Sequence, residues 1–443
     1  MFKGKSGQTG VIFVLAALFG GGGAGYGLSN LVVQIAALII LALNYDAVRI
    51  FFTTAPRLLI ALVLATLALP LLQLIPLPPA IWPALPGRQL ISEAYGFAQG
   101  PNWSALTVNQ ARTLVAFIGL IAPFSLFAIG WSVELADRQR LIALVIGMGL
   151  LNLLPGIAEV LNGNGQSLLY PANSMPGVMF GLFANRNSTG LFLDCCLLLL
   201  VAQPAAKRII HGIFGKLMIA TLLVLGVVLT QSRSSIALLA LPAGLALAKA
   251  MAARLDTSAF KPAASPRALL ATGIAAVLII SLVPILSDTR LGAVADRFEQ
   301  GDGQRSLIWE DARFSAQRYW PIGAGMGTFD EVFQVDESLE YISQRRAGRA
   351  HNDYLELAIE AGAVGLALAV CWALWIALAA WRAIATPQRW PALAGSGIIL
   401  AIALQSLLDF PLRNQTMLCL AAFAILLVVP QRKATLANDE PAI

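Results

Sequence analysis

The chain has 443 residues, of which 58% are hydrophobic and only 12% are charged, and its mean hydropathy is +0.75. A soluble domain carries about 25% charged residues, so this composition excludes a soluble globular protein and indicates an integral membrane protein. The formal charge of +6 does not require a nucleic-acid partner, because excess Lys and Arg usually mark the cytosolic loops of a helix bundle.

The apolar runs are about 18–22 residues long, which is typical of membrane-spanning helices rather than of barrel strands of roughly ten residues. We therefore predict an all-α fold, with residues 1–443 as a single integral membrane domain of about twelve spans. The predicted spans are 10–28, 30–43, 58–77, 113–131, 141–159, 180–202, 217–231, 235–253, 268–286, 361–381, 391–409 and 413–430.

The first span follows Lys3 and Lys5 like a signal peptide, but the glycine run after it lacks a convincing cleavage site, so we expect an uncleaved helix. With the N-terminus in the cytosol, all seven lysines fall in cytosolic segments and every outer basic residue is an arginine. This agrees with the positive-inside rule. It predicts that both termini are cytosolic, with the outer connection near 78–112 lying on the membrane surface.

Residues 287–360 form a polar island between the ninth and tenth predicted spans, with eight arginines and no lysine. We expect this island to be a large helical loop on the outer, periplasmic side. Helical spacing over Arg305–Tyr319 predicts a helix, and Pro321–Gly327 follows as a glycine-rich loop. The loop lacks the Gly-Lys-Ser/Thr ending of a phosphate-binding loop, so a tight connection is the better interpretation.

The island ends in His351-Asn352-Asp353, which holds one of only two histidines. Asn352 or Asp353 is expected to cap a helix that starts at Tyr354. His351 is then either a solvated residue beside the cap or a general base, and both interpretations stay open. A zinc site is not expected, because no second outward-facing His or Cys accompanies it.

Four outer arginines stand out. Arg305 opens the predicted helix of the island, and Arg186, Arg233 and Arg413 lie in other outer segments. An isolated loop arginine usually contacts lipid headgroups or solvent. Arg233, however, occupies a turn so short that it must lie at the membrane boundary between two helices. The planar guanidinium suits phosphate and diphosphate, so several converging arginines would stabilise the charge on a departing diphosphate.

Inside the predicted sixth span lies Asp194, which should face the bundle interior, either for a function or to pair with another helix. The four cysteines all fall in apolar runs and are expected to be small buried side chains rather than metal ligands or disulfides. These cysteines are Cys195, Cys196, Cys371 and Cys419.

Several short motifs occur in a fixed order between Asn185 and Arg413. They are Ser232–Ser234, Arg305 with Trp309, Pro321–Phe329, His351–Glu356, Gly362–Leu366 and, more weakly, Asp409–Pro411. In order, spacing and placement around one long outer loop, they resemble the O-antigen ligase and O-antigen polymerase superfamily of the bacterial inner membrane. The first 180 residues resemble the superfamily only in being apolar, membrane-spanning segments without a specific motif.

This resemblance implies a GT-C-like, metal-independent, inverting glycosyltransferase without a cofactor. Its donor would be a glycan on undecaprenyl diphosphate, and its acceptor lipid A-core or another lipid-linked glycan. The essential residues of the superfamily correspond to His351, Arg305 and Arg233, which we predict to be catalytic. We predict that Arg186, Asn352, Asp353 and Arg413 bind substrate.

Three functions stay open at this point. A single dominant outer loop favours O-antigen ligation to lipid A-core over O-antigen or exopolysaccharide polymerisation. A flippase or transporter of lipid-linked glycan is the alternative from another class. It is less favoured, because transporters usually place polar residues near the bilayer midplane, whereas the ionisable residues here gather outside.

Overall fold

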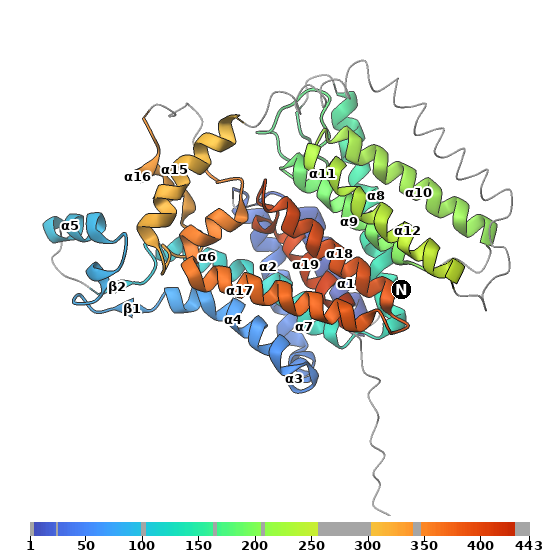
Figure 1. Ribbon diagram of the computed structural model, residues 1–443, viewed down its shortest axis with the longest axis horizontal. Coiled ribbons are helices and arrows are strands. Elements are labelled where there is room, and N and C mark those ends of the chain that lie inside the picture. The colour runs from blue at the N-terminus through green and yellow to red at the C-terminus, as the bar shows by residue number, and fades with distance from the viewer. Residues whose placement is uncertain are drawn as a thin grey trace, which may run out of the picture.

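A computed structural model describes residues 4–23, 25–98, 103–162, 166–204, 209–255, 303–339 and 347–429. This part of the chain is almost entirely helical, and its one sheet is a two-stranded antiparallel ribbon that pairs β1 (Pro76–Leu77) with β2 (Ser104–Ala105). Long helices form a bundle, and α5, α15 and α16 make a smaller lobe at one end of it (Figure 1). The all-α prediction is confirmed.

The helices divide into the bundle and the lobe. Those of the bundle are α1 (Gly4–Phe19), α2 (Gly27–Leu43), α3 (Tyr45–Thr54), α4 (Arg57–Gln73), α6 (Gln110–Gly119), α7 (Ile121–Trp131), α8 (Leu135–Leu161), α9 (Arg186–Ala202), α10 (Ile209–Leu229), α11 (Arg233–Leu238), α12 (Ala240–Leu255), α17 (Asp353–Ala383), α18 (Arg389–Gln405) and α19 (Gln415–Val428). Those of the lobe are the short 3-10 helix η1 (Trp82–Ala84), α5 (Gln89–Ala98), α15 (Gly303–Tyr319) and α16 (Phe329–Asp336).

The bundle is that of a multi-pass membrane protein. Within the described ranges, five helical stretches are long and apolar enough to cross a membrane: Gln110–Trp131, Leu135–Leu161, Gly212–Leu229, Arg233–Ala253 and Asp353–Ala383. A sixth arises if α2 and α3, bent by 77°, form one broken span. The count of about twelve stays a prediction, because several apolar helices are shorter than a full span and the predicted span 268–286 lies outside the described residues.

The hydrophobic core centres on α9, which is buried on every side from Ser188 to Leu200. A helix that is apolar all round belongs in the middle of a bundle, and α9 packs against α8, α10, α12 and α18. Asp194 is fully buried within it, so the expectation that it faces the interior is confirmed. Neither of its carboxylate oxygens has a hydrogen-bond partner among the described residues.

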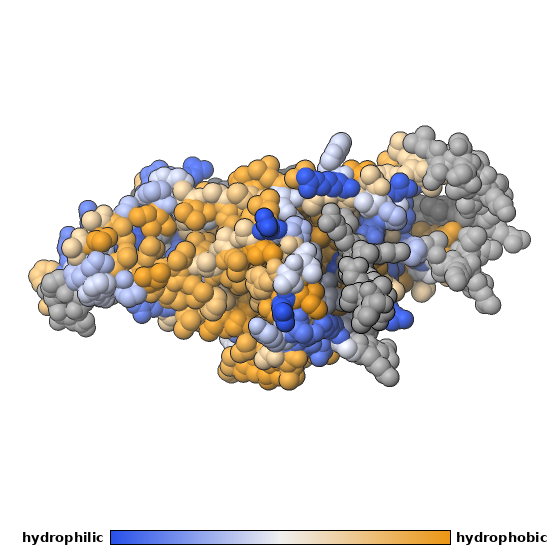
Figure 2. Space-filling model, turned by 90° about the horizontal axis from the view of Figure 1, so that it is seen from below, coloured by the Kyte–Doolittle hydropathy of each residue, from blue (hydrophilic) through white to orange (hydrophobic). Residues whose placement is uncertain are grey.

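Three of the cysteines are buried as predicted, whereas Cys371 is exposed on the surface of α17. The prediction for Cys371 was wrong because a membrane protein also exposes apolar residues toward lipid, and hydrophobicity alone does not separate that surface from the core. The face in Figure 2 shows this directly: hydrophobic residues cover most of the bundle, and hydrophilic residues are confined to patches.

The connection between α4 and α6 packs against the lobe. Arg88 is completely buried there, and its guanidinium donates to the carbonyls of Leu106 (2.5 Å) and Gly323 (2.8 Å). At the far end of the same connection, Arg112 pairs with Glu331 of α16 at 2.6 Å. The 78–112 connection therefore fixes the lobe to the bundle. We had predicted only that it lies on the membrane surface, and that location stays a prediction.

Candidate functional site

His351 immediately precedes α17, and the local sequence sets its backbone. The side chain of Asn352 accepts hydrogen bonds from the backbone N–H groups of Tyr354 and Leu355, both at 3.0 Å, so the predicted cap is confirmed and the helix begins at Asp353. His351 itself has φ +51°, which a non-glycine residue adopts at an energetic cost. Such strain occurs mainly where the surrounding contacts hold a side chain for function.

The imidazole of His351 contacts a buried carboxylate. Nδ1 of His351 lies 3.2 Å from Oδ1 of Asp409, whose side chain is 1% exposed against 34% for the histidine. Oδ2 of Asp409 accepts hydrogen bonds from the amides of Asn185 and Asn187, both at 2.8 Å. On the other side, the ring of Phe410 is 4.9 Å from the imidazole. The histidine is thus oriented by a carboxylate that is itself held in place.

These contacts also decide the charge of Asp409. Burial raises the pKa of its carboxyl, but the hydrogen bonds from His351, Asn187 and Asn185 outweigh burial, so the pKa is lowered below its ordinary value. Asp409 is therefore ionised at neutral pH. An ionised partner favours the tautomer of His351 with its proton on Nδ1, which leaves Nε2 as the basic nitrogen.

The same asparagines connect the histidine to the turn that holds Arg233. Asn185 is the N-cap of α9, and Arg186 and Asn187 are its first residues. The backbone carbonyl of Asn187 accepts a hydrogen bond from Oγ of Ser235 at 3.4 Å. Ser235 lies in the first turn of α11, which begins at Arg233. The starts of α9 and α11 therefore meet, and each carries one of the predicted arginines.

This contact between α9 and α11 depends on small residues. A Cβ at Gly190 would lie 2.3 Å from Oγ of Ser235, so a larger residue at either position would force the two helices apart. Ser232 caps α11 by accepting from the N–H of Ser235 at 3.3 Å, and Gln231 before it has φ +51°. The turn around Arg233 is thus tightly constrained.

Arg305 belongs to α15 of the lobe, which is also fixed to the histidine segment. The indole N–H of Trp309 donates to the carbonyl of Ala350 at 2.7 Å, and Ala350 directly precedes His351. Arg305 lies one helical turn before Trp309 on the same face of α15. The structure thus brings together the elements that carry His351, Arg186, Arg233 and Arg305.

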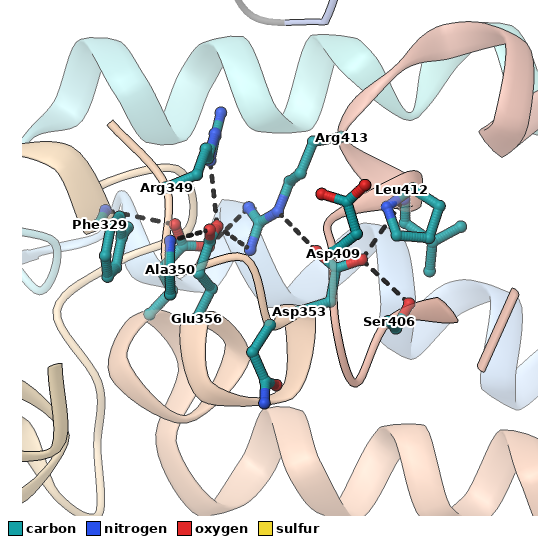
Figure 3. Close-up of polar contacts among 12 residues, drawn as sticks. Phe329, Arg349, Ala350, Asp353, Glu356, Ser406, Asp409, Leu412 and Arg413 are labelled. Carbon is teal, nitrogen blue, oxygen red and sulfur yellow. Dashed lines mark hydrogen bonds and ion pairs between the residues drawn. The ribbon is translucent and has the colours of Figure 1, made fainter. Parts of the chain in front are cut away.

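Arg413 lies nearby but has a different environment (Figure 3). Its guanidinium is within 3.2 Å of Asp353, 3.0 Å of Glu356 and 2.8 Å of Glu360, the last two fully buried. Burial lowers the pKa of Arg413, but these carboxylates outweigh burial and raise it. With internal partners on every side, Arg413 and Asp353 are placed to hold the start of α17, and their predicted substrate contacts stay predictions.

The carboxylates around Arg413 also fix the loops that shape the site. Glu356 accepts from the N–H of Ala350 at 2.9 Å and pairs with Arg349 at 3.1 Å, as Figure 3 shows. Glu360 accepts from the N–H of Phe329 at 3.3 Å. The segment before α17 and the start of α16 are therefore both bonded to buried glutamates, which lie one helical turn apart on α17.

The glycine loop 321–327 is a tight connection, as predicted. Gly325 has φ +118°, and a Cβ there would lie 1.9 Å from Oγ1 of Thr107. The N–H groups of Ala324 and Gly325 donate to the carbonyls of Ile359 and Glu360, both at 2.8 Å. Because these amides are already bonded to the chain, the loop fixes the lobe to α17 rather than binding phosphate.

Sequence reasoning did not assign Asp409, Asn185 or Asn187. The only signal in the sequence was their location in outer segments. Asp409 is also the first residue of Asp409–Pro411, the weakest of the short motifs that resemble the superfamily. Within the described residues, no group of three His, Cys, Asp or Glu side chains is arranged to hold a metal ion. What the site offers chemically is an oriented imidazole, an ionised carboxylate and arginines on adjoining elements.

A family model described as O-antigen ligase matches residues 218–370, a range that includes Arg233, Arg305 and His351. The predicted resemblance is confirmed over this region, which is similar to the O-antigen ligase family. No curated protein matches the chain. The match leaves Asp409, Arg413 and Arg186 outside its bounds, although Asp409 contacts His351 directly.

Proposed function

We propose that this protein is an inverting glycosyltransferase that moves a glycan from undecaprenyl diphosphate to lipid A-core, as in O-antigen ligation. The observation that carries the proposal is the chain of contacts from His351 through Asp409 and Asn187 to the start of α11. This chain brings a candidate base to the arginine turns of α9 and α11. The similarity of residues 218–370 to the O-antigen ligase family supports the reaction class, and the geometry supports these residues as its site.

The chemistry is a single displacement. An acceptor hydroxyl attacks the anomeric carbon of the donor, a new C–O bond forms, and the bond to the diphosphate oxygen breaks with inversion. Nε2 of His351 takes the proton of the hydroxyl, and Asp409 stabilises the resulting imidazolium through Nδ1. The departing diphosphate keeps the electron pair, and guanidinium groups stabilise its growing negative charge.

The arginines therefore have a different role from the histidine. Arg233 and Arg305 are proposed to bind the diphosphate, and Arg186 to support them from the first turn of α9. The N-terminal ends of α9 and α11 add the positive end of a helix dipole, although α11 is short. Such a site stabilises the leaving group without requiring a metal ion.

A lipid-linked donor fits the proposed location. We propose an inner-membrane protein with both termini in the cytosol and the site facing the periplasm, because lysines are confined to segments on the opposite side. Nucleotide sugars are made in the cytosol, so a transferase that works outside needs a donor that arrives already activated. A glycan on a lipid diphosphate meets that need.

A glycolipid profile of a deletion strain tests this function. Loss of a ligase leaves full-length glycan on undecaprenyl diphosphate together with bare lipid A-core. Loss of a polymerase leaves single repeat units, and loss of a flippase stops units on the inner face. Either of the last two profiles would overturn the ligase proposal. Complementation with Arg233→Ala should fail, while Arg382→Gln, an exposed residue at the far end of α17, should restore the glycan.

A further inference from the structure

A cavity with a largely apolar lining lies at the end of the bundle opposite His351. Its volume is about 420 Å³, and it opens between the starts of α8 and α18 and the ends of α9 and α19. Trp390 lines it, whereas Ser406, sixteen residues further along α18, bonds Asp353 at the candidate active site. At 1.5 Å per residue, the two ends lie about 24 Å apart along this helix. The cavity is therefore separate from the transferase site.

Three cations gather at this cavity, two of them in its wall. Arg138 donates to the carbonyl of Leu426 at 2.6 Å, and Lys249 donates to the carbonyl of Gln203 at 3.0 Å. Lys216 donates to the same Gln203 carbonyl at 2.6 Å. In the part of the chain that the structure describes, none of the three forms an ion pair with a carboxylate, and no acidic residue lines the cavity.

Helix dipoles add to this positive potential. Leu135 and Ala136 at the start of α8 and Gln388 and Trp390 at the start of α18 line the cavity, and neither helix has a side-chain cap at its N-terminus. The positive ends of two long helices thus point to the same region as the cations. Asp137, in the first turn of α8, pairs with Arg140 rather than with Arg138, Lys216 or Lys249. Among the described residues these three cations contact carbonyls, so a bound anion would add an opposite charge that stabilises them.

The rest of the wall is apolar. Apart from the cations and two glutamines, it consists of aliphatic side chains, prolines and Trp390, whose ring lies 5.8 Å from Nζ of Lys249 and 5.2 Å from the guanidinium of Arg389. Tryptophan beside cations is typical of the membrane–water interface. A ligand for this cavity therefore combines a negative charge with an apolar body.

We infer that this cavity binds the phosphate headgroup of an anionic phospholipid, such as phosphatidylglycerol. The headgroup phosphate lies beside Lys249 and Arg138, and the glycerol and first acyl carbons contact Trp390 and the prolines. Basic pockets between membrane helices bind anionic headgroups in this way. In the proposed orientation the lipid belongs to the cytosolic leaflet, and its binding does not depend on the glycan-transfer reaction at the other end.

Native mass spectrometry of the full chain tests this inference, with phosphatidylglycerol and phosphatidylcholine supplied in equal amounts. Wild type should retain phosphatidylglycerol in preference, and Lys249→Met should lower its retention about five-fold, since one cation near a headgroup contributes about 1 kcal/mol. Arg382→Met is the matched control, because Arg382 is an exposed cation at the same end of the bundle, and it should bind like wild type.

A second pair of variants guards against misfolding, because Lys249 also holds the last carbonyls of α9. Lys249→Arg should keep the lipid, and Trp390→Leu, which removes no bond to α9, should lower its retention at least about two-fold. Equal retention of the two lipids by wild type, or unchanged retention by both Lys249→Met and Trp390→Leu, would overturn the inference. Full displacement of the lipid by inorganic phosphate at millimolar concentration would do the same, since it marks a site for free anions.

Discussion

Two charged clusters share the start of α17 and the segment between α18 and α19, yet they are built in opposite ways. In the cluster around His351 the imidazole is one-third exposed, although its partner Asp409 is buried, and the histidine itself has a strained backbone. Around Arg413 the charges are enclosed, and a single guanidinium contacts three carboxylates. The first arrangement leaves a reactive group accessible, and the second fixes the frame that holds it. A buried ion cluster beside an active site is thus not necessarily part of its chemistry.

The sharpest way to separate the clusters is to remove the histidine. His351→Ala should lower the rate of glycan transfer by about 10²–10⁴-fold, because it removes the proposed general base. The free energy of unfolding should fall by about 1–3 kcal/mol, because buried Asp409 loses one partner but keeps its hydrogen bonds from Asn185 and Asn187. Transfer by purified protein in nanodiscs, together with thermal unfolding, measures both quantities. Transfer at the wild-type rate would remove His351 from the mechanism.

Removing the arginine should have the converse effect. Arg413→Met should destabilise the protein by about 3–5 kcal/mol, because three carboxylates would lose their buried partner. Arg112→Met is the control: its pair with Glu331 is half exposed, so its loss should cost at most about 1 kcal/mol. Unfolding of both variants by denaturant gives the comparison. If Arg413→Met unfolds like wild type but loses transfer, Arg413 contacts substrate instead.

Asp409 belongs to the cluster around His351, and its substitution should affect the transfer rate more than stability. Asp409→Asn keeps the shape but loses the charge that orients His351, so we expect a fall in the transfer rate of about 10–100-fold. The pH profile of transfer is the decisive readout, because the carboxylate stabilises the imidazolium form of the histidine. An Asp409→Asn profile that is lower but unchanged in shape would mean that Asp409 supports only the fold.

The glycine loop 321–327, like the cluster around Arg413, should affect stability rather than the chemistry of transfer. Gly325→Ala should destabilise the protein by about 1–3 kcal/mol, because φ +118° and the contact with Thr107 both exclude a Cβ. At Gly244, inside α12, a Cβ would meet nothing within 4 Å, so Gly244→Ala should be neutral or slightly stabilising. Equal unfolding temperatures for the two variants would contradict this prediction and show that the loop accommodates a Cβ at Gly325 without strain.

The smallest expected effect concerns pH. Because the folded pKa of Asp409 is below its ordinary value, its ionised form stabilises the fold at any pH above that ordinary value, about 4, and this contribution is lost as pH falls through the lowered pKa. The difference in unfolding temperature between wild type and Asp409→Asn should therefore shrink as the pH falls from about 4 through the lowered pKa of Asp409. A difference that does not shrink in this acid range contradicts the assignment.

The features that sequence predicted well depend on neighbouring residues. The Asn352 cap, the glycine loop and the helix after Arg305 are encoded within a few positions each, and all three occur in the structure. The partners of His351 and Arg413 lie 53–60 residues away along the chain, so no local pattern reports them. Residue types that suited a diphosphate site equally suited a buried ion cluster, and only the contacts distinguish the two.

The number of spans could not be predicted for a related reason. Hydropathy treats any apolar run as one span, but α2 and α3 bend by 77° around Asn44, and several apolar helices are shorter than a full span. Backbone breaks of this kind depend on packing and capping between helices rather than on hydropathy. Composition therefore predicted a helical membrane protein without determining how many helices cross it.

In the proposed mechanism, arginines bind the diphosphate and His351 activates the acceptor. Binding of undecaprenyl diphosphate to the purified protein in nanodiscs, measured in parallel with transfer, separates these two roles most directly. Arg233→Ala should lose binding and transfer together, whereas His351→Ala should lose transfer while binding the lipid diphosphate like wild type. Unchanged binding by Arg233→Ala, or loss of binding by a folded His351→Ala, would contradict this mechanism.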